Sequence, residues 1–459
     1  MRGREAIIAA ALAGVVLAAA CAWPGPRAGI EAVGEATAFT NVTLIDGTGA
    51  PPRRGVTVLV RDRRVAEVFA AGAKQLPPGT AVVDGTGRYL IPGLIDAHIH
   101  LGTMPNRPRN VTEAILANAF MGGVTAARDM GGQTATVVPL AARAAEDTTP
   151  WPRVYYSALL AGPGTWFEGA RGRFMAEGGA AGSTPLVRLI ADTTDVRAAV
   201  AAARRAGASG LKLYNTIPLA RVRELAREAH RQGLRVWSHL AVDPARPSEL
   251  VEAGVDVVSH ADQFVAEVLP YPPGGVMVED FRAARHQAFQ RTSSRTPAMQ
   301  RVLAEMRRRG TMLDPTLFVM TPSPDSTGRV PERAAALYRF ATDMVRAAHA
   351  AGVPIVAGTD ALGGSTPNIH VELQLLVDSA GLTPPEALRA ATANAAVALG
   401  VADSLGTVAV GKLADLVLLR ADPLADIANT QTVVGVMKAG RWHPRAAPMR
   451  SPPRARPPR

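Results

Sequence analysis

Strand-like and helix-like segments alternate through the centre of the chain, and this alternation is what most restricts its possible folds. Eight short runs rich in apolar residues lie at 94–102, 123–131, 153–161, 210–215, 235–241, 255–261, 311–319 and 354–361. Helical stretches lie between them, for instance at 331–351 and at 218–232, where apolar residues recur at helical spacing. This order predicts an α/β fold in which a parallel sheet closes into a (β/α)8 barrel. A doubly wound sheet is the alternative. No G-x-G-x-x-G motif follows the first strand, which argues against dinucleotide binding, the commonest cofactor function of that fold.

The two flanks of this central region consist of short strand-like runs. Valine-rich alternation broken by "DGTG" turns fills 38–93, and 403–443 contains the similar runs "GTVAVGKLADLVLL" and "VVGVMKAGRW". Neither flank is expected to form a stable sheet alone. We therefore expect them to pair as one composite β-sandwich from both chain ends, beside a barrel formed by 94–402.

Residues 1–21 have the features of an export signal. Arg2 and Arg4 precede an apolar stretch at 7–20, which is shorter than a membrane span. The stretch ends in "LAAAC", which suits signal peptidase cleavage, and Cys21, the single cysteine, also suits lipid attachment as in bacterial lipoproteins. We expect an exported protein (periplasmic, lipid-anchored or secreted), with 22–37 as a linker and Cys21 as its only link to a membrane.

The net charge of +11 is concentrated near the C-terminus, because seven basic residues and no acidic residue follow Asp426. The Pro/Arg composition of 444–459 predicts a disordered tail. No nucleic-acid recognition motif accompanies the charge, so we expect a small-molecule substrate and no nucleic-acid partner. The sequence leaves the oligomeric state open, a homo-oligomer included.

Side chains that can bind metals stand at the ends of the predicted strands. His98 and His100 are two positions apart on the first strand, so both imidazoles point the same way. Later strands end in Lys212, His239, His260 and Asp360. Each alone has a simpler interpretation, such as a hydrogen-bonded structural histidine or an aspartate in a turn. Together, on the face where barrels carry their chemistry, they predict a metal site whose ligands suit zinc, with manganese, iron or cobalt as alternatives.

Lys212 interrupts the apolar run of "GASGLKLYNTIP" at 207–218. A lysine in a buried parallel strand is unfavourable unless its charge is neutralised. It either reaches a carboxylate at the surface or belongs to the strand-end site.

The strand-end residues lie within recognisable motifs. "YLIPGLIDAHIHLG" at 89–102 resembles the first-strand signature of the amidohydrolase superfamily. "GVTAARDMGG" at 123–132 and the stretch 370–419 resemble its imidazolonepropionase-like and Xaa-Pro-dipeptidase-like branch. The resemblance extends from about residue 38 to 443. It implies a distorted (β/α)8 barrel with a composite β-sandwich.

The resemblance also implies a binuclear site with two divalent metal ions, zinc being the expected metal. His98 and His100 would bind the first ion, and His239 and His260 the second. A carbamate formed on Lys212 from CO2 would bridge them. Asp360 would ligate the first metal and act as general base and acid toward a hydroxide held by both ions.

The residues that contact the substrate are less defined. The resemblance implies that Tyr214 faces the substrate and that His370 lines the mouth of the site or supports the loop of Asp360. The branch often has a histidine after the third strand, but 159–174 has none, and Trp166 stands there instead. Arg128 either contributes to the pocket or pairs with Asp129.

We therefore expect an exported metal-dependent hydrolase of an amide, a dipeptide, an N-acyl amino acid or a cyclic amide. The alternatives are a lactone, ester or phosphoester hydrolase with the same site, a mononuclear deaminase, and a non-catalytic binding protein. Lys212 argues against the deaminase, which generally lacks a bridging lysine, and the complete ligand set argues against a binding protein.

Overall fold

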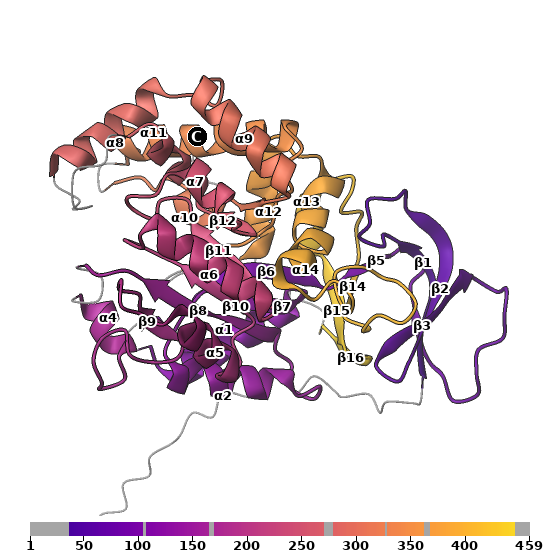
Figure 1. Cartoon of the computed structure of the whole chain (residues 1–459). Coiled ribbons are helices and arrows are strands. Elements are labelled where there is room, and N and C mark those ends of the chain that lie inside the picture. The colour runs from indigo at the N-terminus through magenta and orange to yellow at the C-terminus, as the bar shows by residue number, and fades with distance from the viewer. Residues whose placement is uncertain are drawn as a thin grey trace, which may run out of the picture.

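The computed structural model describes residues 36–103, 107–164, 169–269, 279–325, 328–361 and 368–445. These residues form a barrel with helices around it and a separate sheet at one side (Figure 1). The predicted export signal with Cys21, Trp166 and most of the predicted tail lie outside the described residues. Within the described ranges, no helix has the length and apolar character that a membrane crossing requires.

The barrel consists of parallel strands in the order β6-β7-β8-β10-β11-β12-β13. Their bounds are Leu94–Ile99, Val124–Asp129, Arg153–Ala161, Gly210–Leu213, Arg235–His239, Val257–Ser259 and Met312–Asp314, and β9 (Val187–Leu189) pairs with β8. An irregular eighth segment closes the ring, because Ile355 bridges to Leu313 and Ala361 bridges to Ile99. The structure thus confirms the predicted α/β barrel.

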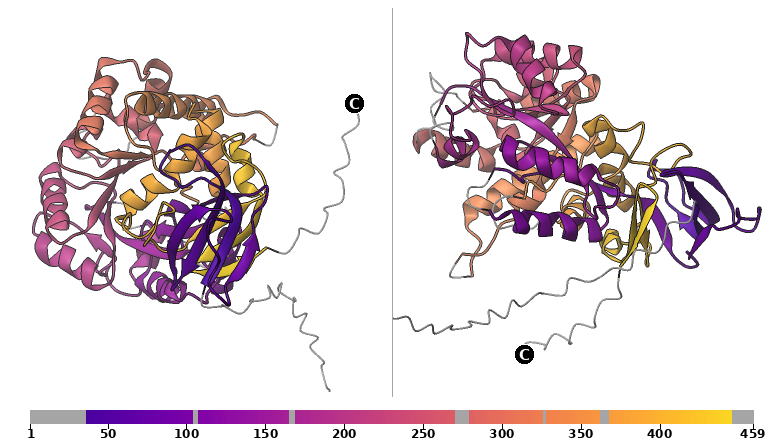
Figure 2. Two further views of the ribbon diagram at one scale, coloured as in Figure 1. Left: turned by 90° about the vertical axis from the view of Figure 1, so that its right-hand side faces the viewer. Right: turned by 90° about the horizontal axis from the view of Figure 1, so that it is seen from below.

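Helices form the outer layer of the barrel (Figure 2). They are α1 (Arg109–Met121), α2 (Thr134–Ala145), α4 (Ala170–Met175), α5 (Val196–Arg205), α6 (Leu219–Arg231), α7 (Pro247–Glu252), α8 (Glu279–Arg291), α9 (Pro297–Arg309), α10 (Leu317–Met320), α11 (Glu332–Ala350), α12 (Ile369–Asp378), α13 (Pro384–Ala390) and α14 (Ala393–Leu399), with the 3-10 helices η1 (Ala261–Glu267) and η2 (Ile427–Gln431). Helix α6 buries Val222, Leu225, Ala226 and Ala229, the face that its sequence periodicity predicts.

Both ends of the described chain contribute to the second sheet, as expected. Its strands are β1 (Ala36–Leu44), β2 (Arg53–Arg61), β3 (Arg64–Ala70), β4 (Ala81–Asp84), β5 (Tyr89–Pro92), β14 (Leu416–Leu419), β15 (Val433–Lys438) and β16 (Arg441–Pro444). They form one mixed sheet in the order β16-β15-β14-β5-β1-β2-β3, with β4 beside β1. Strand β5 pairs antiparallel with β14, so Leu90 faces Leu418 although 328 positions separate them in the chain. Because β5 leads directly into β6, this sheet anchors the start of the first barrel strand.

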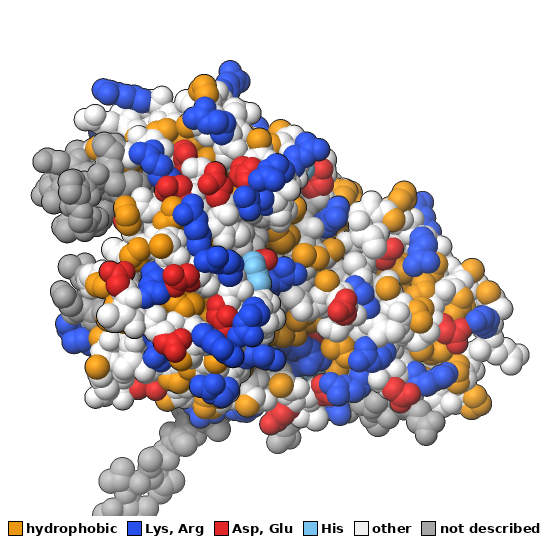
Figure 3. Space-filling view, viewed as in Figure 1, with side chains coloured by type: hydrophobic (Ala, Val, Ile, Leu, Met, Phe, Trp, Pro, Cys, Tyr) orange, Lys and Arg blue, Asp and Glu red, His pale blue; other side chains and the backbone are white. Residues whose placement is uncertain are grey.

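The surface carries basic and acidic side chains side by side. On the face in Figure 3, lysine and arginine side chains are spread over the molecule with acidic side chains among them. Many of the acidic side chains are paired locally, for example Glu305 with Arg308 and Arg309 on α9.

Candidate metal centre

The strand-end residues that the sequence singled out meet at one end of the barrel. A cavity of about 280 Å³ is lined by His98, His100, Lys212, His239, His260 and Asp360, together with Tyr214 and several apolar side chains. Five of the six lie in the last residues of a barrel strand or directly after it, and Asp360 lies at the end of the irregular eighth segment. The fold therefore brings together residues that are up to 262 positions apart in the chain.

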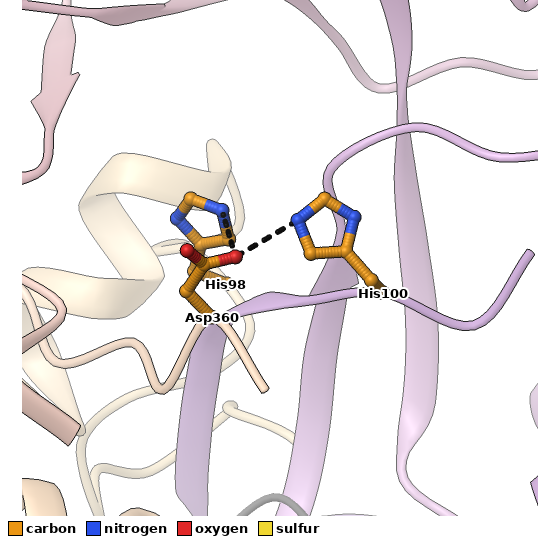
Figure 4. A group of neighbouring side chains, drawn as sticks. All are labelled: His98, His100 and Asp360. Carbon is orange, nitrogen blue, oxygen red and sulfur yellow. Dashed lines mark ion pairs between the residues drawn. The ribbon is translucent and has the colours of Figure 1, made fainter. Parts of the chain in front are cut away.

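His98, His100 and Asp360 form the tightest group (Figure 4). Oδ1 of Asp360 lies 3.3 Å from Nε2 of His98 and 3.0 Å from Nε2 of His100. The eighth segment reaches this position because the backbone N–H of Asp360 donates to the carbonyl of His98 at 2.8 Å. Ligand atoms from all three residues lie within 4.8 Å of one another, close enough to bind one metal ion.

His239 and His260 complete the group of imidazoles. Their ring centroids are 4.6 Å apart, and the ring of His260 lies 5.2 Å from that of His98. Burial, together with neighbouring positive groups, holds the pKa of both His239 and His260 well below the usual histidine range. Both rings are therefore neutral near pH 7, and a neutral ring has the lone pair that a metal ligand needs.

Lys212 is almost completely buried, with 1% of its surface exposed. Its Nζ donates to Oγ of Ser259 at 2.8 Å, and its side chain lines the cavity with the histidines. The alternative that it reaches a surface carboxylate is thus wrong. Burial lowers the pKa of Lys212 to about 8, which makes an uncharged amine accessible near neutral pH.

Asp314 is a site residue that the sequence analysis missed. Its Oδ2 lies 2.6 Å from Nδ1 of His98, and neither side chain has more than 1% of its surface exposed. A carboxylate on the far nitrogen fixes the ring orientation of a ligand histidine and increases its basicity. Asp314 ends strand β13, the same kind of position as the other site residues, and that signal could have identified it.

Two further buried carboxylates hold the backbone beneath the site. Asp96 accepts from the backbone N–H and the hydroxyl of Thr359 at 3.0 and 2.8 Å and from the N–H of His98 at 3.3 Å. Asp129 accepts from the N–H of Gly131 at 2.9 Å and from that of Leu101. These bonds join the first barrel strand to its neighbours on both sides. The carboxylate of Asp96 positions both His98 and the segment that carries Asp360.

The backbone is strained at the site. His260, Thr316 and Asp360 have φ values of 75°, 53° and 49°, in the left-handed region that non-glycine residues rarely adopt. The hydroxyl of Thr316 lies 3.0 Å from Nδ1 of His260. Strained backbone conformations of this kind are kept only where surrounding contacts hold them in place, and they cluster at functional sites.

The donor set fits divalent metal ions. It combines four imidazoles with a carboxylate, and Nδ1 of His100 is buried without a hydrogen-bond partner among the described residues. Imidazole and carboxylate without thiolate are ligands of zinc and of other first-row metals. Metal ions held here would also offset the carboxylates of Asp360 and Asp314 in the barrel.

Tyr214 lines the metal-site cavity, and its contact with a substrate stays a prediction. Its ring centroid is 4.1 Å from that of His239. The same residue lines a second cavity of about 230 Å³ beside the first.

Arg128 does not reach the cavity, so that part of the substrate prediction is corrected. Its guanidinium is completely buried inside the barrel, donates to Oγ of Ser209 at 3.0 Å and stacks 5.2 Å from the ring of Trp237. The expected ion pair with Asp129 is not formed either, because the Asp129 carboxylate accepts from backbone N–H groups. Neighbouring residues on a strand point to opposite faces, which separates the two side chains.

His370 also lies away from the cavity. Its Nδ1 is 2.9 Å from Oγ1 of Thr430 and its Nε2 is 2.9 Å from the carbonyl of Gly122, so both ring nitrogens are used in joining α12 to η2 and to the end of α1. It does not line the mouth of the described cavity. Residues 362–367, which follow Asp360, lie outside the described residues, so a role of His370 in that loop stays a prediction.

A family model for the amidohydrolase family matches residues 89–443, which include the whole barrel, the six strand-end residues of the cavity and the C-terminal strands of the second sheet. The chain belongs to the amidohydrolase family. The chain is similar to ochratoxinase of Aspergillus niger, with 28% identity over 455 residues (87% of this chain and 84% of that protein). Imidazolonepropionase of Stenotrophomonas maltophilia is 26% identical over 406 residues (85% and 92%).

Solved structures agree with this membership. A putative prolidase from Bifidobacterium longum is 29% identical, with a TM-score of 0.66 over 92% of this chain and 97% of that one. A Xaa-Pro dipeptidase with methionine in its active site has a TM-score of 0.69 at 20% identity, over 89% and 100% of the two chains, and supports the fold. The protein is accordingly an amidohydrolase-family hydrolase with a His-His-Asp metal site, similar to prolidases and ochratoxinase.

Proposed function

We propose that this amidohydrolase uses two divalent metal ions to hydrolyse a C–N bond in a small amide, such as a dipeptide or an N-acyl amino acid. The observation that carries the proposal is the convergence of four histidines, one aspartate and one buried lysine on a single cavity. The names of the similar proteins refer to Xaa-Pro dipeptides and to ochratoxin, both small molecules, which supports a small substrate here.

In this proposal His98, His100 and Asp360 hold one ion and His239 and His260 the other. Bound zinc or a similar ion supplies Lewis acidity and lowers the pKa of water from 15.7 to about 7. The protein orients the ligands through Asp314 and Asp96, and it limits access of bulk water through the apolar walls of Leu159, Met175 and Met320.

Lys212 is proposed to carry a carbamate. The ammonium first loses one proton, and the neutral amine then attacks the carbon of CO2 and loses a second proton, so that a cationic side chain becomes an anionic carbamate with the release of two protons in all. The buried position favours this change, because an ammonium there would face metal ions without a carboxylate in contact with it among the described residues.

Asp360 is proposed to move the proton of the reaction. Its carboxylate is held beside His98 and His100, and the charge of His98 together with the hydrogen bonds from both rings keeps its pKa well below the usual range despite burial. It is therefore ionised and able to accept a proton from the attacking water and return it to the leaving nitrogen. Acid–base catalysis is worth about 10²–10⁴ in rate, so Asp360→Asn should retain its metals and lose at least about 100-fold in turnover.

The experiment that tests the function is a hydrolysis screen of the metal-reconstituted full chain. Dipeptides including Xaa-Pro, N-acyl amino acids, cyclic amides and lactones are compared in wild type and Asp360→Asn. Cleavage of amides that disappears in the variant supports the proposal. Cleavage of lactones alone would replace it with the ester-hydrolase alternative.

Export is proposed on the sequence alone. Expression of the full chain in a bacterium, followed by mass measurement of the mature protein, distinguishes the forms. Cleavage before Cys21 with added lipid mass indicates a lipoprotein, cleavage without added mass indicates a free exported protein, and an intact N-terminus contradicts export.

A further inference from the structure

A second cavity adjoins the metal-site cavity. It has a volume of about 230 Å³ and shares Tyr214, His239 and Gln263 with the first. We call it the side chamber. One of the shared residues, His239, is a proposed metal ligand, so a group bound in the side chamber would lie beside the proposed metal site.

Arg285 on α8 contributes the guanidinium of the side chamber. Its Nη2 lies 2.7 Å from Oδ2 of Asp262, and its guanidinium carbon lies 5.6 Å from the ring centroid of Phe289. Asp262 lines the metal-site cavity while Arg285 lines the side chamber, so this ion pair spans the boundary between them. The aspartate and the aromatic ring together fix the orientation of the guanidinium.

The guanidinium has capacity left for a ligand. Within the described part of the chain, Asp262 is its one hydrogen-bonded partner, through one of five N–H donors. The Arg285 side chain is 28% exposed, so the remaining donors are accessible. A bidentate carboxylate is the group that matches an arginine's fork of donors best.

Other polar groups of the side chamber also favour an acceptor-rich ligand. Gln263 accepts from the N–H of Ala241 through Oε1 at 3.0 Å, which leaves its amide N–H groups as donors. Asn215 adds a further amide. Asp243 is the acidic residue in the lining, and it is already engaged in an interaction. Val265, Ala266 and Leu269 supply an apolar wall.

We propose that the side chamber binds a free carboxylate of the substrate through Arg285, so that the enzyme prefers amides of amino acids with an unblocked carboxyl group and an apolar side chain. This inference rests on the proposed function, since it assigns a specificity to the same site. Arg285 is a binding residue in this account and takes no part in the bond cleavage.

The test compares a carboxylate with its neutral carboxamide. N-acetyl-L-leucine and N-acetyl-L-leucinamide are titrated into metal-reconstituted full-length Asp360→Asn by calorimetry, so that binding is measured without turnover. We expect the acid to bind at least about tenfold more tightly than the amide. Arg285→Met should abolish this preference, and Arg285→Lys, which keeps the charge and loses the fork, should retain part of it.

Arg291→Met is the matched control, because Arg291 is an exposed arginine on the same helix and does not line the chamber. It should keep the full preference. Two results would overturn the inference. One is a preference for the acid that survives in Arg285→Met, which a carboxylate bound directly to the metals would give. The other is equal binding of the acid and the amide by the Asp360→Asn parent.

Turnover is read separately with the Asp360 side chain intact. Hydrolysis of amides without any dependence on Arg285 leaves the proposed function standing and removes the side-chamber inference. Arg285-dependent binding without hydrolysis of any amide supports the side-chamber inference and contradicts the proposed function.

Discussion

Oδ2 of Asp314 lies 2.6 Å from Nδ1 of His98, and both side chains are buried at the centre of the barrel face. The contact leaves Nε2 of His98 directed toward Asp360. One aspartate therefore sets the orientation of a proposed metal ligand, although 216 positions separate the two residues in the chain.

Asp314→Asn should weaken metal binding by about 10–100-fold, because an amide is a poorer acceptor for the His98 ring than a carboxylate. The measurement is a competition with a chelator at graded metal concentrations. Circular dichroism of the variant checks that the fold is kept. Wild-type metal affinity in a folded Asp314→Asn protein would show that this contact does not tune the site.

Gly358→Ala should disrupt the site through crowding. A Cβ at this position would lie 2.6 Å from Cβ of His98 and 2.6 Å from Oδ1 of Asp314, closer than such atoms pack. We expect a lower thermal midpoint, in line with the 1–3 kcal/mol that overpacking costs, and fewer bound metal ions.

Gly122→Ala serves as the control, since its φ is −82° and its Cβ would meet nothing closer than 3.2 Å. It should keep wild-type metal content. Equal behaviour of the two alanine variants in thermal melting and in metal analysis would contradict the crowding account.

Glu372 predicts a pH dependence of stability. It is completely buried, accepts from the N–H groups of Leu317 and Phe318 at 3.1 and 2.6 Å, and burial raises its pKa to about 8. The unfolded chain releases this proton near the usual glutamate pKa, whereas the folded protein keeps it. The contribution of Glu372 to the free energy of unfolding is therefore highest below the unfolded pKa and falls as pH rises toward 8, by up to about 1.4 kcal/mol per pH unit.

Glu372→Gln removes this titration. The thermal midpoint of the variant relative to wild type should increase between pH 5 and 8, measured by calorimetry on metal-loaded proteins. A difference that stays constant across that range would contradict the assignment.

The sequence analysis predicted the fold and the gathering of the site because both depend on strand order. In a parallel barrel, a residue at the carboxyl end of any strand lies on one face, so His98, Lys212, His239 and Asp360 could be grouped without coordinates. The sequence predicted that the two flanks pair, because neither could form a stable sheet alone, and the structure shows that β5 and β14 make this pairing.

What the sequence could not determine was which neighbour each polar side chain meets. Arg128 and Asp129 are adjacent in the chain but point to opposite sides of β7. His370 lies in the first turn of α12 and bonds to Gly122, at the end of α1. Asp314 ends β13 and could have been grouped with the site by the same rule, but its contact with the ring of His98, 216 positions away, cannot be seen in the sequence. The side chamber depends on how η1 packs against α8, which periodicity does not reveal.

Lys212→Ala should lose most of its activity, because the proposed carbamate is an anionic ligand that alanine cannot replace. Added acetate or propionate should restore part of the rate, since a small carboxylate can occupy the space that the side chain leaves. The measurement is turnover of the best amide from the screen at increasing carboxylate concentration. Full activity of the variant without carboxylate would show that Lys212 is not a ligand.

The central claim is that this cavity holds two catalytic metal ions. The direct measurement is the number of divalent metal ions per chain, determined by elemental analysis of wild-type protein reconstituted in the presence of bicarbonate. We expect two ions per chain in wild type and a loss of bound metal in His98→Ala and in His239→Ala. A count of one in wild type would contradict the binuclear site, and a count of zero in a folded, active protein would contradict the account as a whole.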